Sequence, residues 1–159
     1  MTQTLKMSVA AFALMTSCAW AAQDSIIIGM QLEPPNLDPT GGAAAAIDEV
    51  TYANLFEGLT RFASDGAVVP GLAQSWSVSE DGLMWTFDLR PGVVFHDGTA
   101  MDSADVVFSL NRARAEDSTN AQKALFAGIV DVSAPDATTV VITLNAPNGN
   151  FAFNMAWGD

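Results

Sequence analysis

The only histidine of the chain, His96, stands directly before Asp97, and this pair is the most obvious candidate for chemistry. An imidazole held beside a carboxylate could act as a general base. Two adjacent side chains on a turn rarely face the same point, however, and Gly98 follows them as it would in a turn. We therefore expect His96 and Asp97 to form a solvated turn rather than a catalytic pair.

Other motifs of enzymes and metal sites are missing from the sequence. There is no G-x-S-x-G nucleophile elbow and no Gly-Lys-Ser/Thr phosphate loop, and a single histidine cannot supply an H-E-x-x-H zinc site. The acidic pairs Asp102/Asp105 and Glu116/Asp117 fit helix ends and solvated loops better than a calcium cage, which needs a dense acidic loop. We expect no metal and no cofactor.

The composition limits the classes of protein that this chain could be. It has 159 residues, of which 50% are hydrophobic and 15% charged, which indicates a folded domain or part of a larger protein and excludes full disorder. Its 18 acidic and 6 basic residues give a net charge of −12. Nucleic-acid binding requires clustered Lys and Arg to neutralise phosphates. We therefore expect no nucleic-acid partner.

The first 22 residues have the pattern of a secretory signal peptide. Lys6 is followed by the apolar run Met7–Met15 and by the small-x-small sequence at 19–21. The run is too short to span a hydrocarbon core of about 30 Å. We expect cleavage after Ala21 or Ala22 and an exported mature chain.

Cys18, the only cysteine, lies within this segment and leaves one alternative open. A lipoprotein signal would make Cys18 the lipid-modified first residue of the mature protein, although the residues before it match that pattern loosely. Ordinary cleavage is the favoured interpretation. The mature chain would then have no thiol, no disulfide and no cysteine-ligated metal.

Strand and helix patterns are mixed along the mature chain, which predicts an α/β fold. Ser25–Met30 contains three isoleucines and predicts a buried strand. Asp48 and Glu49 suit the first turn of a helix that ends near Gly58. The apolar residues of that helix have the i, i+3, i+4, i+7 spacing of a core-facing stripe: Tyr52, Leu55, Phe56 and Leu59.

Two hairpins and further helices are expected beyond residue 70. Residues 75–90 alternate on both sides of a Glu-Asp-Gly turn at 80–82 and predict the first hairpin. Asp102 can cap a helix whose apolar positions are Val106, Val107, Leu110 and Ala113. Residues 129–144 predict a second hairpin with its turn at 134–137, and residues 148–157 another helix.

Several multi-residue blocks stand in a fixed order along the chain. They are Asn-Leu-Asp-Pro at 36–39, Leu-Phe-Glu-Gly-Leu at 55–59, and the runs at 71–76, 79–90, 92–99 and 104–109. In order and spacing these blocks resemble the family 5 extracellular solute-binding proteins, which are the dipeptide-, oligopeptide- and nickel-binding components of bacterial ABC importers. The resemblance covers essentially the whole mature chain. It implies an α/β, periplasmic binding protein-like fold, two-lobed and of class II, of which this chain is the N-terminal portion with a mixed sheet and hairpins.

The resemblance also implies a division of the chain and a function. Residues 1–21 would be the signal peptide, 22–60 the start of the first ligand-binding lobe, and 61–159 a smaller inserted α/β domain that is cut short at its C-terminus. The expected protein is a periplasmic, non-enzymatic monomer that captures di- or oligopeptides and delivers them to permease subunits in the inner membrane. The alternatives are another solute such as a nickel complex, an exported hydrolase, or a purely structural exported domain.

Two stretches would contact the solute if the family geometry holds. In peptide-binding members, the segment after the Leu-Asp-Pro block lends backbone groups to an extended ligand, and small side chains allow that approach. Relatives also place an aromatic ring some ten residues after Arg112, where this chain departs from them with Gln122, near Phe126. The alternative for the first stretch is a plain loop that runs into a helix. The candidate solute-contact residues are Gly41, Gly42, Ala43, Ala44, Ala45, Ala46 and Gln122.

Overall fold

The computed structural model describes residues 25–157. The chain forms two units, Met1–Gln31 and Leu32–Asp159, and the described helices and strands belong to the second. The predicted signal peptide at 1–21, its cleavage after Ala21 or Ala22 and the alternative at Cys18 lie outside the described residues. In the described part, no helix has the length and apolar character needed to cross a membrane.

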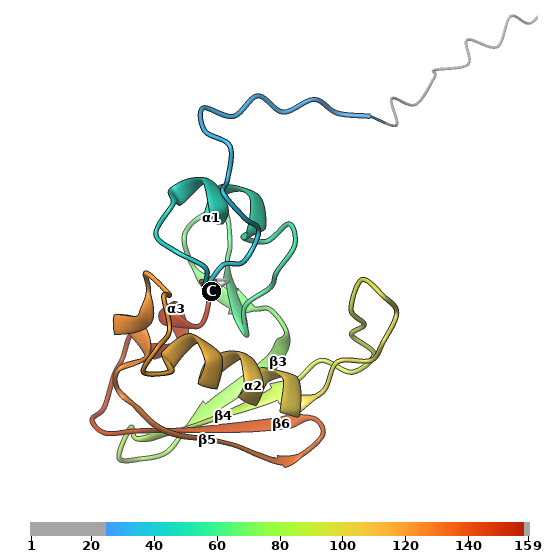
Figure 1. Ribbon diagram of the computed structural model, residues 1–159. Helices are drawn as coiled ribbons and strands as arrows, with labels where there is room; N and C mark the ends of the chain where they lie inside the picture. Colours follow the sequence, from blue (N-terminus) through green and yellow to red (C-terminus); the bar gives the residue numbers. More distant parts are fainter. Residues whose placement is uncertain (1–24, 158–159) are drawn as a thin grey trace, which may run out of the picture. The chain divides into compact units, whose positions relative to one another are not determined.

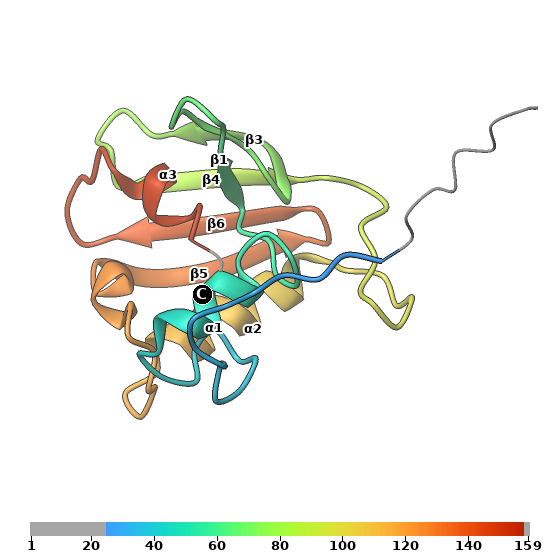
Figure 2. The same cartoon turned by 90° about the horizontal axis from the view of Figure 1, so that it is seen from above.

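A four-stranded antiparallel sheet with one helix on its face forms the main layer of the second unit (Figure 1). Its strands follow the spatial order β3 (Ala73–Val78), β4 (Met84–Leu89), β6 (Thr139–Leu144) and β5 (Ile129–Asp136). Figure 2 shows this order from above, with α2 (Ser103–Arg114) on the side of the sheet where β5 lies. The sheet therefore consists of two hairpins joined through their neighbouring strands β4 and β6.

The inner face of this sheet follows from the period-2 alternation of its two central strands. Phe87 and Val140 are fully buried and pair with each other in register. Strands with one buried face alternate apolar and polar side chains, and neighbouring strands align their apolar positions into one layer. Both predicted hairpins are confirmed. The buried side chains of the central strands are Trp85, Phe87, Leu89, Val140, Ile142 and Leu144.

The turn of the second hairpin lies later than predicted. We expected it at 134–137, but β5 continues to Asp136 and the turn consists of residues 137–138. The pairing shifts between Ser133 and Asp136, which marks a bulge in an edge strand. Proline lacks an N–H and is tolerated in strands at edges and bulges, so Pro135 does not end β5.

Helix α2 forms as its sequence predicts. The Asp102 side chain accepts a hydrogen bond from the Ala104 N–H, and the Asp105 side chain accepts one from the Asp102 N–H, which completes a capping box. Val106, Leu110 and Ala113 are buried, whereas Val107 is half-buried. The helix is therefore fixed at its start by polar caps and along its length by packing.

The first helix lies earlier in the chain than predicted. Helix α1 spans Ala45–Thr51, and Ala53 adopts a left-handed conformation with φ of 55°. The Thr51 carbonyl accepts hydrogen bonds from residues 54–56 and so closes the chain into a turn. Tyr52 packs instead against Phe62 and Trp157, with ring centroids 6.4 and 6.3 Å away. The prediction of a helical stripe through residues 52–59 is wrong because these tertiary contacts override it.

The predicted buried strand at Ser25–Met30 is also absent. Ile26, Ile27 and Ile28 are 82%, 98% and 73% exposed, and none of the described strands pairs with this segment. A strand needs a neighbour to satisfy its backbone N–H and C=O groups. Without such a neighbour among residues 25–157, apolar and β-branched residues do not form a strand here.

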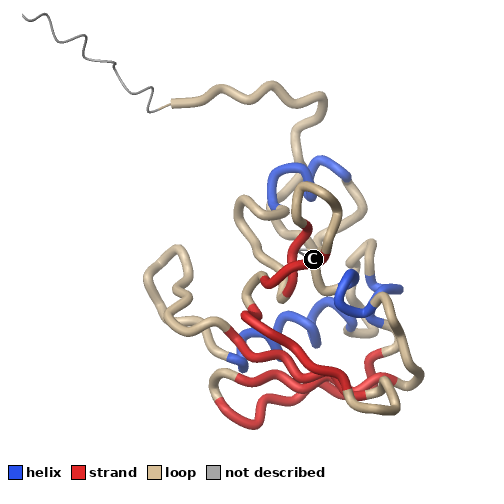
Figure 3. The backbone as a smooth tube through the Cα atoms, turned by 180° about the vertical axis from the view of Figure 1, so that it is seen from behind, coloured by secondary structure: helices blue, strands red, loops and turns tan. Residues whose placement is uncertain are grey.

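Four short elements complete the description of the second unit. Strand β1 (Thr60–Phe62) pairs with β2 (Val68–Pro70) in a separate two-stranded sheet, which Figure 3 shows apart from the larger one. The Thr60 hydroxyl donates to the Ala152 carbonyl at 2.6 Å and ties β1 to α3 (Phe151–Asn154). This α3 confirms the helix expected at 148–157, in shortened form, and η1 (Lys123–Phe126) precedes β5. The expected domain boundary between residues 60 and 61 falls inside β1 and stays a prediction.

Candidate functional site

The Asn-Leu-Asp-Pro block forms a compact turn. The Asn36 side-chain oxygen accepts the Asp38 N–H at 2.9 Å, and the Asp38 carbonyl accepts the Gly41 N–H at 2.9 Å. A Cβ added at Gly41 would lie only 2.8 Å from that Asn36 oxygen, so a larger residue there would displace the Asn36 side chain from the turn. The turn determines where the chain enters the predicted solute-contact segment.

The Asp38 carboxylate accepts hydrogen bonds from two residues far apart in sequence, Thr40 and Arg112. One carboxylate oxygen accepts the Thr40 N–H and hydroxyl at 3.1 and 3.0 Å. The Arg112 guanidinium donates to both carboxylate oxygens, with one nitrogen 3.0 Å from Oδ1 and the other in contact with Oδ2. The hydrogen bonds from Arg112, followed by those from Thr40, lower the pKa of Asp38 to about 2 although partial burial opposes them. Asp38 in turn raises the pKa of Arg112.

Two residues that flank the predicted solute-contact stretches, Thr40 and Thr119, contact each other. The Thr119 hydroxyl donates to the Thr40 carbonyl at 3.1 Å, a contact between residues 79 positions apart. Next to it, the buried Asn120 accepts the Gln122 N–H at 2.7 Å through its side-chain oxygen. Thr40 directly precedes Gly41, and Thr119 lies three residues before Gln122, the residue just ahead of η1.

Asn120 itself was not foreseen from the sequence. Its side-chain Nδ2 is buried and finds no hydrogen-bond acceptor within the described part of the chain. Leaving a buried amide donor without an acceptor costs free energy. An Asn two residues before Gln122 was the only signal in the sequence, and many loops contain one.

The residues from Gly41 to Ala46 differ in how accessible they are. Gly42 has a φ of +149°, and Ala43 is exposed. Ala44 is the half-buried residue before α1, and its carbonyl accepts the Ile47 N–H at 2.8 Å. Ala45 is exposed on α1, whereas the Ala46 side chain is buried. Ala43 is therefore accessible to solvent and Gly42 partly so, whereas the Ala46 side chain is not.

The second candidate stretch has a half-buried and a buried member. Gln122 is half-buried, whereas the nearby Phe126 is only 2% exposed and packs in the core. The Phe126 ring is therefore almost fully covered, although it lies in the wall of the hollow described next.

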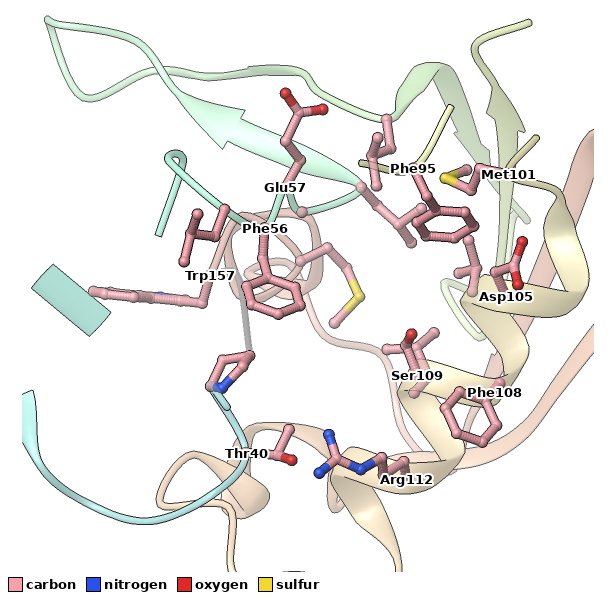
Figure 4. A pocket seen from close by; sticks show the side chains of 18 of the residues that line it. Thr40, Phe56, Glu57, Phe95, Met101, Asp105, Phe108, Ser109, Arg112 and Trp157 are labelled. Carbon is pink, nitrogen blue, oxygen red and sulfur yellow. The ribbon is translucent and has the colours of Figure 1, made fainter. Parts of the chain in front are cut away.

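A hollow of about 780 Å³ opens beside this site (Figure 4). Its lining is largely apolar and includes Phe56, Phe95 and Phe108, with Thr40 and Arg112 along one side. Gly41–Ala46 and Gln122 do not line it. Phe108 lines this hollow and is 68% exposed; the sequence signal for it was a phenylalanine outside the apolar positions of the helix.

The His96–Asp97 pair does not form a catalytic arrangement. The Asp97 carboxylate accepts the Thr99 N–H at 2.9 Å and the Thr99 hydroxyl at 2.7 Å. These hydrogen bonds lower the pKa of Asp97, and both side chains lie in an exposed turn. Over residues 25–157, no group of three or more His, Cys, Asp or Glu side chains is arranged to hold a metal ion.

Comparisons with known proteins agree on one family. Residues 67–157 match the family model described as "Bacterial extracellular solute-binding proteins, family 5 Middle". The chain is also 37% identical over 145 residues to the glutathione-binding protein GsiB of Pectobacterium atrosepticum. That alignment covers 91% of this chain and 28% of GsiB, so the chain spans little more than a quarter of this relative's length.

Solved structures extend the likeness to the fold. NikZ from Campylobacter jejuni, in complex with Ni(L-His), superposes with a TM-score of 0.71 at 29% identity, over 80% of this chain and 25% of NikZ. The Escherichia coli murein tripeptide binding protein MppA gives 0.67 at 33% identity, over 78% of this chain and 27% of MppA. These neighbours are two-lobed periplasmic binding proteins, and the present chain matches a mixed α/β part of them. The predicted fold class is confirmed.

Proposed function

Because this chain belongs to the bacterial extracellular solute-binding proteins of family 5, we propose that the protein captures small peptides for an ABC importer. The proposal concerns a protein of its relatives' length, since the chain spans 28% of the curated relative. In it, residues 25–157 contribute one wall of the solute site. Binding proteins of this kind work by capture and release, and the permease moves the solute.

The observation that carries this proposal is the hydrogen bond between Thr119 and Thr40. It joins two residues, 79 positions apart in sequence, that lie just before the two stretches that family resemblance associates with the solute. Within the described residues, the N–H groups of Gly42 and Ala43 make no hydrogen bond. A ligand backbone can pair with such free groups where side chains are small, as in strand addition.

A peptide is favoured over other solutes by the relatives' own cargo. GsiB is named for binding glutathione, which is a tripeptide, and MppA for binding a murein tripeptide. NikZ, whose structure holds a nickel–histidine complex, supports a second candidate. Both kinds of solute present amino-acid carboxylate and amine groups. Open backbone groups at residues 42–43 suit the extended peptide better, because it offers a row of amide partners.

The protein is further proposed to be a non-enzymatic monomer exported to the periplasm, where it meets permease subunits of the inner membrane. Family membership supports binding rather than turnover, since the family consists of solute-binding proteins. The engagement of Asp97 by Thr99 instead of His96 agrees with this role. The signal pattern in residues 1–22 supports export.

Isothermal titration of the full-length protein tests this function. Glutathione and trialanine serve as peptide probes, and a nickel–histidine complex as the competing solute. We expect saturable binding of at least one peptide, with the ligand recovered unchanged by mass spectrometry. Binding of the nickel complex alone would replace peptide uptake with the second candidate, and cleaved peptide would indicate a hydrolase.

A further inference from the structure

We propose that Asp38 and Arg112 form a positioning pair that holds the segment 40–44 in its solute-binding arrangement. The pair is not a ligand contact in this proposal. It acts through Thr40 on the backbone at residues 42–43, and the part of the proposal that concerns affinity rests on the proposed function.

The pair belongs to a chain of hydrogen bonds that links three segments. Arg112 donates to both oxygens of Asp38, which also accepts from the Thr40 N–H and hydroxyl. Thr40 in turn accepts from the Thr119 hydroxyl through its carbonyl. Thr40 is only 8% exposed, so this middle link is shielded from water. Bidentate guanidinium–carboxylate geometry fixes direction as well as distance. The residues just before both candidate stretches are thereby linked to α2.

Helix α2 is a suitable support for such a link. Its capping box fixes its start, and Val106, Leu110 and Ala113 anchor it in the core. Near its end, Arg114 donates to the Ile129 carbonyl of β5 at 3.0 Å. The last turn of a helix also favours a cation such as Arg112. Arg112 is therefore presented from a rigid element.

The segment that Asp38 belongs to depends on this link more than α2 does. Its own hydrogen bonds are local, from Asn36 to Gly41. Figure 4 shows the Arg112 guanidinium beside Thr40 at the edge of the hollow. Within residues 32–44, the side-chain hydrogen bonds that reach distant residues of the described chain are those of Asp38 with Arg112 and of Thr40 with Thr119. Removing the first leaves the segment with one such link.

Because Asp38 and Arg112 are partly exposed, a positioning role and a structural role of the pair predict different effects of substitution. The side chains of Asp38 and Arg112 are 38% and 47% exposed, so water screens their attraction and global stability depends on it weakly. Local order depends on it more, because opening one segment does not require unfolding the sheet. A merely structural pair would lower the melting temperature and leave affinity unchanged.

Hydrogen exchange and titration on the full-length protein test this proposal. The variants are Asp38→Asn, which keeps an acceptor for Thr40, Arg112→Gln, and the double variant. Asp131→Asn removes an exposed charge elsewhere and serves as the control. We expect exchange of the Gly41 and Ile47 amides to rise about fivefold in each single variant, with little further rise in the double variant. The melting temperature should stay within about 3 °C of wild type, and exchange in β3 and β4 should not change.

Affinity provides the second readout. The Kd for glutathione or trialanine should rise about fivefold in both single variants. Arg112→Lys should bind more tightly than Arg112→Gln and less tightly than wild type, because lysine keeps the charge but not the bidentate geometry. Unchanged amide exchange at Gly41 and Ile47 would overturn the proposed positioning role of the pair. Strictly additive effects of the two single variants in the double variant would do the same. Faster exchange with an unchanged Kd would refute its link to the solute. If wild type binds neither peptide, the proposed function fails for these solutes, and exchange and additivity alone decide on the pair.

Discussion

The sheet layer at residues 73–144 and the segment at residues 32–44 are held in place by different forces. In the sheet layer, fully buried apolar side chains such as Phe87 and Ile142 fill the space under α2. In the segment, the contacts that reach across the sequence with directed geometry are polar: Asp38 with Arg112, and Thr40 with Thr119. Burial makes the layer stable, whereas directed hydrogen bonds orient the segment without adding much stability.

This difference predicts that substitutions in the buried face of the sheet lower the free energy of unfolding most. Phe87→Ala removes a fully buried ring that packs against Trp85 and Phe151, with centroids 6.3 and 6.4 Å away. We expect a loss of about 3–5 kcal/mol in the free energy of unfolding, measured by urea titration of the full-length protein. Val78→Ala, at a side chain 44% exposed in the adjacent strand, is the control and should cost less than about 1 kcal/mol. Similar losses in both variants would contradict the assigned faces of the hairpin.

Helix α2 allows the same comparison within one element. Leu110 is 8% exposed, while Phe108, two residues earlier, is 68% exposed at the hollow. Leu110→Ala should cost about 2–4 kcal/mol and Phe108→Ala about 0.5 kcal/mol or less, by the same titration. A large loss for Phe108→Ala would mean that another part of the full-length protein covers this ring.

The sheet layer could be predicted from the sequence, whereas the contacts of the segment could not. The hairpins and α2 were predictable because alternation and capping are local patterns that burial then rewards. The strand at 25–30 was mispredicted because its apolar residues find no neighbouring strand and stay exposed. The helix through residues 52–59 was mispredicted because Tyr52 packs on Trp157 instead of on a helical stripe. The contact of Thr119 with Thr40 was not predictable, since it joins two loops across 79 positions and no local pattern specifies it. The candidate solute-contact residues are those implied by the resemblance to family 5, and their contact with a solute stays a prediction.

A bulky side chain in the segment should affect binding and not stability. Ala43 is exposed and lies outside α1, so Ala43→Trp in the full-length protein should leave the melting temperature unchanged. It should weaken binding of glutathione or trialanine by on the order of tenfold, equivalent to about 1.4 kcal/mol, because the indole would occupy the approach to Gly42. Ala44→Trp is a less specific test, because Ala44 is half-buried at the start of α1.

The control for that experiment is Ala67→Trp, at an exposed position in the turn between β1 and β2. It should leave affinity and melting temperature as in wild type. Equal affinities of the Ala43→Trp and wild-type proteins in calorimetry would exclude this segment from the solute site.

The smallest expected effect is a dependence on acidic pH that belongs to Asp38 alone. Its pKa is about 2 in the folded protein, against 3.8 for an unperturbed carboxyl, so the folded state releases the proton more readily. The ion pair therefore contributes its full stability above about pH 4, and this contribution is lost as the pH falls through 2. Since both side chains are partly exposed, the contribution should not exceed about 1 kcal/mol.

Subtracting the Asp38→Asn variant from wild type isolates this effect. Asp81, Asp97 and Asp136 also have lowered pKa values, each through hydrogen bonds with neighbouring side chains and backbone, but they titrate alike in both proteins and cancel. The difference in unfolding free energy should be constant from pH 5 to pH 8 and shrink below about pH 4. A difference that grows toward low pH would reverse the sign required by a lowered pKa. Asp38 would then be unpaired in solution, and the segment would have lost the link that distinguishes it from a free loop.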